Sequence, residues 1–407
     1  MPIRGVLLRQ RILVTALGAG ALAVAGLTAP AGAYAAPITP YTAGKHAAQV
    51  CSAAKAKHTA SCHAIKLVAS NGVTPAATAP PATGLTPTGL RDAYKLNGLS
   101  AGGRTVAIVD AYGYPNLERD LGVYRSQFGL SACTTANGCL KIINQTGGTT
   151  LPTFNAGWAG EQALDVDAVS AAAPDAKILV VQAKSASFAD LGTAVQTAAK
   201  QAGVVAISNS YGGGDASDSD YGTYYNHPGI AVTASTGDDG YQGGSYPASS
   251  SYTTAVGGTS LVAASNTRGW SETVWDGAGS GCSTYNTALS AAASFGTGCS
   301  KRAMADVSAA ADPGKGGMAI YYPTSKTAST WAQFGGTSEA APIIAAVYAL
   351  SGNTTGYANA LPYAHPGSLF DVTIGSNGSC PTTQWCNART GWDGPTGLGT
   401  PNGAAAF

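Results

Sequence analysis

The chain has 407 residues, of which only 11% are charged, and its formal net charge at pH 7 is +1. A chain with so little charge lacks the basic surface that nucleic-acid binding requires, and the same argument speaks against polyanions and a stable membrane association. Its length suits one large domain preceded by a shorter segment.

The first 35 residues have the features of a secretory signal peptide. Arg4, Arg9 and Arg11 precede an apolar stretch at 12–27, and Ala33-Tyr34-Ala35 is a small-residue cleavage site. An uncleaved membrane anchor is the alternative. We favour cleavage, because the small-residue site follows closely and no other segment is long and apolar enough to span a bilayer. The chain is therefore expected to be secreted and extracellular.

Residues 36–84 are rich in Ala, Pro and Thr, and we interpret them as a short prosegment or linker before the main domain at 85–407. Strand and helix signals then alternate. Strands are predicted at 105–110, 177–182 and 204–208, and helices at 117–128, 160–173 and 188–198. Such alternation predicts an α/β fold in which a parallel sheet is covered by helices on both faces.

The eight cysteines fall into four local pairs, which suggests disulfides in an exported chain. The pairs are Cys51 with Cys62, Cys133 with Cys139, Cys282 with Cys299, and Cys380 with Cys386. The sequence does not prove this connectivity. Structural zinc is the weaker alternative, because no Cys-x-x-Cys occurs and only Cys62-His63 places a histidine beside a cysteine.

Ser338 has the sequence context of a nucleophile, because it lies in Gly-Gly-Thr-Ser-Glu-Ala-Ala-Pro, directly before the apolar run 343–350. A serine hydroxyl needs a positioned base. Of the five histidines, only His227 lies between the first core strand and Ser338, as the Asp, His, Ser order of subtilisin-type enzymes requires. Its Tyr-rich, Pro-flanked loop lacks a catalytic context. A carboxylate base is therefore the better hypothesis.

Glu161 and Asp165 are the candidates for that base. They lie four residues apart in the predicted helix and share a face with Ala168 and Ala172. Two carboxylates turned toward packed structure favour sharing one proton, which raises one pKa. Asp167 falls on the opposite side of the helix, where we expect it to be solvated. An acidic, solvent-facing helix surface is the alternative interpretation of the pair.

Two further aspartates follow predicted strands. Asp238 lies in Ala-Ser-Thr-Gly-Asp-Asp-Gly, after the run 230–233. Ligand sites collect at the carboxyl ends of parallel strands, where a protonated carboxyl could donate a hydrogen bond to an oxyanion. A simple turn aspartate is the alternative. Asp110 ends the strand 105–110, and we expect it to assist hydrogen bonding in the site or to cap residues 111–115.

These motifs together resemble the sedolisin family, the serine-carboxyl peptidases, across 85–407. The motifs, in the order of that family, are Glu161-x-x-Leu164-Asp165, Ser208-Asn209-Ser210-Tyr211-Gly212, Ser235-Thr236-Gly237-Asp238-Asp239-Gly240, Gly336-Thr337-Ser338 with Pro342, Asp371-Val372-Thr373, Gly391-Trp392-Asp393 and Thr396-Gly397-Leu398-Gly399.

The resemblance implies a subtilisin-like fold and a role for each motif. Ser338 would be the nucleophile, Glu161 its general base, Asp165 the residue that orients Glu161, and Asp238 part of the oxyanion hole. Backbone groups of the segment that includes Ser208, Ser210, Tyr211 and Gly212 would bind an extended substrate.

A calcium site is predicted near the C-terminus. Asp371 and Asp393 offer hard oxygen ligands, and the turn 390–392 can aim carbonyls inward. By resemblance, the ligands are these two carboxylates and the carbonyls of Val372, Arg389 and Gly391. The family usually has a small residue at the position of Arg389. A pair of turn aspartates is the alternative.

The sequence thus predicts a secreted, calcium-stabilised, acid-active endopeptidase that acts on polypeptides as a monomer. A non-catalytic peptide-binding protein on the same fold is the competing hypothesis, and the presence of all four catalytic positions argues against it. Two features depart from the family. Residues 36–84 are too few for its long folded propeptide, and Gly335-Gly336 stands where Ser-Gly is more common.

Overall fold

The computed structural model describes residues 1–2, 40–41, 45–54, 56–69, 71–72, 77–353 and 355–407. The predicted signal peptide, apart from its first two residues, lies outside them. The chain divides into two units, Met1–Pro37 and Ile38–Phe407, and the helices and strands of the described residues belong to the second. Of the helices in the described part of the chain, none combines the length and the apolar character that a bilayer span needs.

An eight-stranded sheet forms the centre of the second unit. Seven strands follow the order β13-β12-β10-β8-β5-β7-β6, and β16 also pairs with β12. All neighbours run parallel except the antiparallel β12 and β13. The strands are continuous apolar runs because both faces are covered, and Val106–Val109 are fully buried. Their bounds are β5 Thr105–Ala111, β6 Leu140–Asn144, β7 Lys177–Ala183, β8 Val204–Asn209, β10 Ala231–Ser235, β12 Thr254–Ala263, β13 Trp270–Val274 and β16 Val307–Ala310.

Helices cover both faces of this sheet, which confirms the predicted α/β class. On one face α3 (Ala156–Ala172) and α6 (Thr337–Ser351) pack against each other, and α4 (Phe188–Ala199) covers β5, β7 and β8. Side-chain caps begin two of them, because Asn155 accepts from the Trp158 N–H and Ser187 from the Asp190 N–H. The remaining helices are α1 Pro87–Ala93, α2 Leu117–Gln127, α5 Asp218–Tyr221 and α7 Leu361–Ala364, with 3-10 turns at Gly222–Tyr224, Ser290–Phe295, Ala358–Ala360, Pro366–Ser368 and Thr383–Trp385.

The expectation that Asp167 is solvated is wrong. Helix α3 is buried around almost its whole circumference, because α2, α6 and the strand β17 (Ala319–Pro323) pack around it. Asp167 is 1% exposed and accepts a hydrogen bond from the Tyr321 N–H at 3.4 Å. The helical period alone places Asp167 opposite Glu161, but it cannot reveal a second packing partner on that side.

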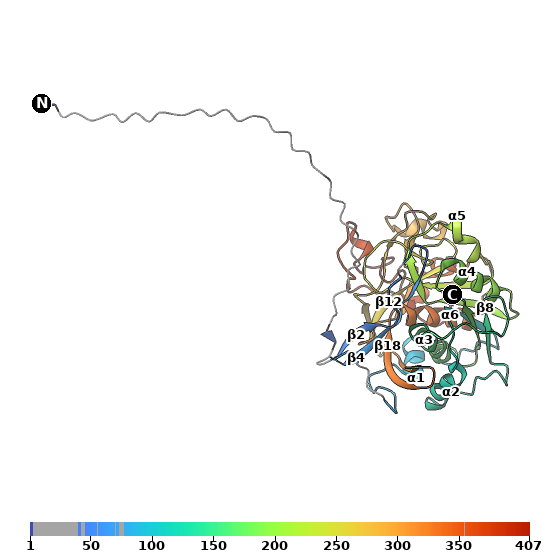
Figure 1. Cartoon of the computed structure of the whole chain (residues 1–407). Coiled ribbons are helices and arrows are strands. Elements are labelled where there is room, and N and C mark those ends of the chain that lie inside the picture. The colour runs from blue at the N-terminus through green and yellow to red at the C-terminus, as the bar shows by residue number, and fades with distance from the viewer. Residues whose placement is uncertain (3–39, 42–44, 55, 70, 73–76, 354) are drawn as a thin grey trace. The chain divides into compact units, whose positions relative to one another are not determined.

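Residues 45–69 pair with strands far along the chain. A five-stranded sheet has the order β1-β2-β4-β18-β17, and Figure 1 draws the blue strands β2 and β4 beside the orange β18. A smaller sheet has the order β11-β9-β3. The bounds are β1 Pro40–Tyr41, β2 Lys45–Gln49, β3 Ser61–Cys62, β4 Ile65–Ala69, β9 Tyr211–Gly214, β11 Ser245–Tyr246 and β18 Ser329–Gly335, and two short pairs join β14 Gly281–Cys282 to β15 Ala303–Met304 and β19 Leu369–Phe370 to β20 Thr400–Pro401.

All eight cysteines form disulfides, in the four local pairs that the sequence suggested: Cys51–Cys62, Cys133–Cys139, Cys282–Cys299 and Cys380–Cys386. The first bond closes the loop between β2 and β3 and therefore braces the N-terminal segment internally.

The buried ion pair of Arg302 with Asp306 generates a test of the fold. Asp306 Oδ1 accepts a hydrogen bond from Arg302 Nη1 at 2.9 Å, and both side chains are almost fully buried. Arg302→Ala leaves a buried carboxylate without its cation, so we predict a loss of about 3–5 kcal/mol in unfolding free energy, measured by urea denaturation. The control is Arg119→Ala, which should cost about 0–1 kcal/mol, because Arg119 is 49% exposed and the buried Asp120 keeps hydrogen bonds from the Tyr114 and Ser329 hydroxyls. Equal losses would refute this ranking.

Candidate active site

The carboxyl ends of β5, β8 and β10 meet the start of α6 and the inner face of α3. Asp110 lies near the end of β5, Ser210 directly follows β8, and Asp238 follows β10 by three residues. Chain connections leave β5 in opposite directions, toward β7 and β6 on one side and toward β8 and β10 on the other. Such a switch point is where open parallel sheets bind ligands.

Ser338 lies at the start of α6, as predicted. The helix begins at Thr337 after Gly336, whose φ of 96° is a conformation that favours glycine. The Ser338 side chain is buried, and its Oγ donates to the Ser210 carbonyl at 3.1 Å. Ser210 in turn donates its hydroxyl to Asp165 Oδ1 at 2.7 Å. The serine and one predicted carboxylate are therefore joined through Ser210.

Glu161, Asp165 and Asp110 form a row of buried carboxyl groups. Each is fully buried. Burial raises the pKa of Glu161 well above its ordinary value, and the charge of Asp110 adds to this, while the facing Ser338 hydroxyl and Ala64 N–H lower it. Neither Glu161 oxygen has a hydrogen-bond partner of ordinary geometry among the described residues, since Ser338 donates to Ser210 instead.

The same physics acts on the two aspartates. Burial raises the pKa of Asp165 well above its ordinary value, and the charges of Asp110 and Glu161 raise it further. Burial likewise raises the pKa of Asp110, which faces Asp165. The row therefore holds protons that an exposed carboxylate would lose. Asp110 contributes to this row of carboxyls, and neither of its oxygens has a hydrogen-bond partner among the described residues.

Asp238 is the fourth buried carboxyl. Its Oδ1 accepts from the Thr337 N–H at 2.7 Å and the Thr337 hydroxyl at 2.9 Å. Burial raises the pKa of Asp238 well above its ordinary value, against the effect of these two bonds. Its Oδ2 has no partner among the described residues and lies 3.0 Å from where a Cβ on Gly336 would be. A protonated Oδ2 could therefore donate into the space beside Ser338.

The predicted substrate segment lies next to the serine. Ser208 is buried inside β8, and the Tyr211 hydroxyl donates to Asn209 Oδ1 at 2.8 Å. Backbone groups of Ser210, Tyr211 and Gly212 face residues 61–63, which pair with them. His227 lies elsewhere, because it precedes β10 at the amino end of that strand, and its Nε2 is 3.0 Å from the Tyr224 carbonyl.

His63 is a site residue that the sequence reasoning missed. Its Nδ1 lies 2.7 Å from Ser235 Oγ, at the end of β10. The residue keeps some exposure, yet its ring is deep enough for burial to lower the pKa of His63 to about 4. The sequence separation of 172 hides this contact from any local pattern. The sequence offered only the Cys62-His63 dipeptide, which we weighed for zinc.

The C-terminal turns bring the two predicted carboxylate ligands of calcium near each other. Asp393 is buried, and its Oδ2 accepts from the Arg389 N–H at 3.2 Å, while Asp371 Oδ2 accepts from the Gly391 N–H at 2.9 Å. Burial raises the pKa of Asp393 to about 7, and the nearby charge of Asp371 contributes. The described residues contain no cluster of three His, Cys, Asp or Glu side chains that could hold a metal. A cation here would need backbone carbonyls.

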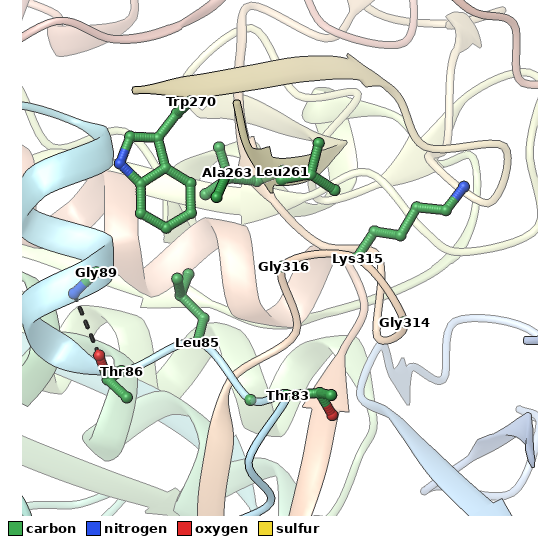
Figure 2. Close-up of a pocket in the computed structure, with 12 residues that line it drawn as sticks. Thr83, Leu85, Thr86, Gly89, Leu261, Ala263, Trp270, Gly314, Lys315 and Gly316 are labelled. Carbon is green, nitrogen blue, oxygen red and sulfur yellow. Dashed lines mark hydrogen bonds between the residues drawn. The ribbon is translucent and has the colours of Figure 1, made fainter. Parts of the chain in front are cut away.

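A surface pocket of about 330 Å³ lies apart from these groups (Figure 2). Leu85, Leu261 and Trp270 line it with the turn 314–316, and Thr86 accepts from the Gly89 N–H at its edge. None of its lining residues belongs to the predicted site.

Comparisons with known proteins agree with this geometry. Residues 153–361 match the Peptidase_S8 model, the subtilase family. Kumamolisin from Bacillus sp. (strain MN-32) is 32% identical over 363 residues, which cover 79% of this chain and 62% of that protein. Sedolisin from Pseudomonas sp. (strain 101) is 33% identical over 174 residues, 38% of this chain and 28% of that one. The chain thus spans less than two thirds of the length of these relatives.

Solved structures give the same result. Pseudomonas sedolisin, complexed with two molecules of pseudo-iodotyrostatin, matches with a TM-score of 0.65 and 26% identity, over 79% of this chain and 96% of that one. Sphericase, at 17% identity and a TM-score of 0.50, over 79% of this chain and 99% of that one, supports the fold alone. The chain belongs to the subtilase family, with a subtilisin-like fold, and within it to the sedolisin family of serine-carboxyl peptidases.

Proposed function

We propose that this protein is a secreted, acid-active endopeptidase that hydrolyses polypeptides through an acyl-enzyme on Ser338. The observation that carries the proposal is the buried row of Glu161, Asp165 and Asp110, joined to Ser338 through Ser210, together with the unpartnered Oδ2 of Asp238. In this proposal residues 1–35 are a signal peptide, residues 36–84 precede the peptidase region, and the four disulfides suit an oxidising exterior.

The proposed reaction uses one ionised carboxylate, Glu161, and one protonated carboxyl, Asp238. Ser338 Oγ turns from the Ser210 carbonyl, attacks the substrate carbonyl carbon and gives its proton to Glu161. Asp165, held by Ser210 and sharing protons with Asp110, orients Glu161 and leaves it the ionised member of the row. Protonated Asp238 donates to the developing oxyanion. Glu161 then protonates the leaving amine, and water hydrolyses the ester by the reverse proton path.

Calcium is the proposed ligand of the C-terminal turns. The residues fit a hard cation, because two carboxylates of like charge lie close enough to affect each other and the segment 389–391 contacts both. Asp371 and Asp393 would bind it with the carbonyls of Val372, Arg389 and Gly391. The Arg389 guanidinium does not interfere, since it extends toward Gly296. Bound calcium would neutralise the two carboxylates and stabilise the turns.

The first prediction of this proposal concerns the pH dependence of the rate. Glu161 must be ionised, so the rate should fall as pH drops through the pKa of its row; Asp238 must be protonated, so the rate should also fall as pH rises through its pKa. Glu161→Gln should lower kcat by about 10²–10⁴-fold. Asp238→Asn should move the alkaline limb upward, because an amide donates at every pH. We would measure hydrolysis of denatured protein from acid to neutral pH.

Two controls make this assay decisive. Ser338→Ala should abolish turnover, and His227→Ala should leave the profile unchanged, since His227 lies at the other end of β10. An alkaline optimum that collapses in His227→Ala and survives in Glu161→Gln would return a histidine to the mechanism. Absence of turnover in every folded form would favour the peptide-binding hypothesis.

The second prediction concerns calcium. A cation that binds only the folded turns stabilises them by mass action, by about 2.7 kcal/mol when its concentration is about a hundredfold above Kd. Chelation should therefore lower Tm in thermal denaturation, and Asp393→Asn should imitate it. Asp220→Asn is the matched control, because Asp220 is exposed in α5. An unchanged Tm after exhaustive calcium removal, verified by elemental analysis, would rule out the site.

A further inference from the structure

The segment 60–63 lies along the backbone that was predicted to bind substrate. Strand β3 pairs antiparallel with β9, with Ser61 opposite Gly212 and Cys62 opposite Tyr211. The His63 N–H then donates to the Ser210 carbonyl at 3.2 Å. An extended peptide that adds a strand to a sheet edge makes this pattern of main-chain bonds. The chain's own segment therefore uses the hydrogen-bonding groups that a substrate would need.

The carbonyl of His63 faces the proposed oxyanion side. A Cβ on Gly336 would lie 1.9 Å from His63 O and 3.1 Å from its carbonyl carbon, so only glycine leaves room for this carbonyl. The same point lies 3.0 Å from Asp238 Oδ2. The His63 carbonyl and the unpartnered Oδ2 of Asp238 thus both lie beside Gly336, two residues before Ser338 in the chain.

The other half of the same peptide bond faces the proposed base. The Ala64 N–H and the Ser338 hydroxyl both face Glu161 and favour its ionised form. In peptide hydrolysis the leaving nitrogen must receive its proton from the general acid. The His63–Ala64 bond therefore lies between the proposed base, which the Ala64 N–H faces, and the proposed oxyanion donor, which lies beside the His63 carbonyl.

The His63 side chain fills a site of its own. Its Nδ1 lies 2.7 Å from Ser235 Oγ, and a Cβ on Gly212 would lie 2.6 Å from its Cε1. A Cβ on Gly237 would lie 3.9 Å from the same Cε1 atom. A planar, polar ring thus fits between two glycines and one hydroxyl.

Bonds on both sides of residue 63 hold it there. The preceding residue, Cys62, is bonded to Cys51, and the Val50 N–H donates to the Ala64 carbonyl at 2.9 Å. Strands β2 and β4 pair along five residues, from Lys45 opposite Ala69 to Gln49 opposite Ile65. The segment is braced before and after the bond.

From these contacts we propose that His63–Ala64 is the bond that this enzyme cleaves in its own chain, and that residues 45–63 are a disulfide-braced inhibitor bound in the manner of a substrate. This rests on the proposed function. The proposed cut also moves the end of the prosegment from the predicted residue 84 to residue 63. The site that binds the His63 ring would then prefer a substrate with an imidazole side chain directly before the scissile bond.

The cleavage step balances. Ser338 Oγ forms a bond to the His63 carbonyl carbon and passes its proton to Glu161; the bond to the Ala64 nitrogen breaks as Glu161 returns the proton to that nitrogen. Water then hydrolyses the His63 ester and restores the serine. The new N-terminus is Ala64, while β2 still pairs with β4. The cut fragment therefore stays bound, and inhibition outlasts the cut.

The test uses the full chain and intact-mass and N-terminal analysis. We expect the wild type to begin at Ala64 and Ser338→Ala to keep its N-terminal segment. Ala64→Pro should block the cut, because proline removes the N–H that faces Glu161, and His63→Glu should slow it at least tenfold. The matched control is Ala53→Pro in the exposed loop between β2 and β3, which should be cut at Ala64.

The outcomes separate this inference from the proposed function. Ser338-dependent hydrolysis of denatured protein, together with an N-terminus elsewhere or with normal processing of Ala64→Pro and His63→Glu, would overturn the inference alone. Absence of all Ser338-dependent cleavage, of the chain itself and of added protein, would overturn both. An N-terminus at Ala64 that depends on Ser338 and on residues 63 and 64 would establish it.

Discussion

The burial of carboxyl groups is the constraint on which this structure depends. Burial is the largest cause that raises the pKa of each member of one set: Asp110, Glu161, Asp165, Asp167, Asp238 and Glu339. Because an ionised carboxylate is poorly solvated there, the folded chain retains protons that the unfolded chain releases. Stability from these groups is present below their unfolded pKa and is lost as pH rises through the raised folded values. Acid therefore suits both the fold and a protonated oxyanion donor.

The fold turns this constraint into a site by distributing the carboxyls over different elements. Glu161 and Asp165 come from one face of α3, Asp110 from the end of β5, and Asp238 from the loop after β10. Ser210 and Thr337 supply hydroxyls that fix one oxygen of Asp165 and one of Asp238. Both oxygens of Asp110 and Glu161, and the second oxygens of Asp165 and Asp238, have no partner among the described residues. The site is thus organised by which oxygens the surrounding chain satisfies and which it leaves for substrate.

Much of the fold and of the candidate site was predictable, because it depends on local sequence patterns. Apolar runs gave the parallel strands, and the four-residue spacing placed Glu161 and Asp165 on one face of a helix. The failures all involve contacts between distant segments. Asp167 is buried by β17, and His63 meets Ser235 across the sheet. The strands within residues 45–69 are short and rich in small or polar side chains. They form because they pair with the edges of β18 and β9, and their own periodicity does not predict them.

Infrared spectroscopy of the carboxyl groups tests the central claim most directly. We would record the full-length Ser338→Ala protein at neutral pH, to avoid self-digestion, and compare it with the same protein carrying Asp165→Asn or, as an exposed control, Asp220→Asn. The account predicts a protonated carboxyl band at neutral pH that weakens with Asp165→Asn and persists with Asp220→Asn. A spectrum in which every carboxyl is ionised at neutral pH would contradict it.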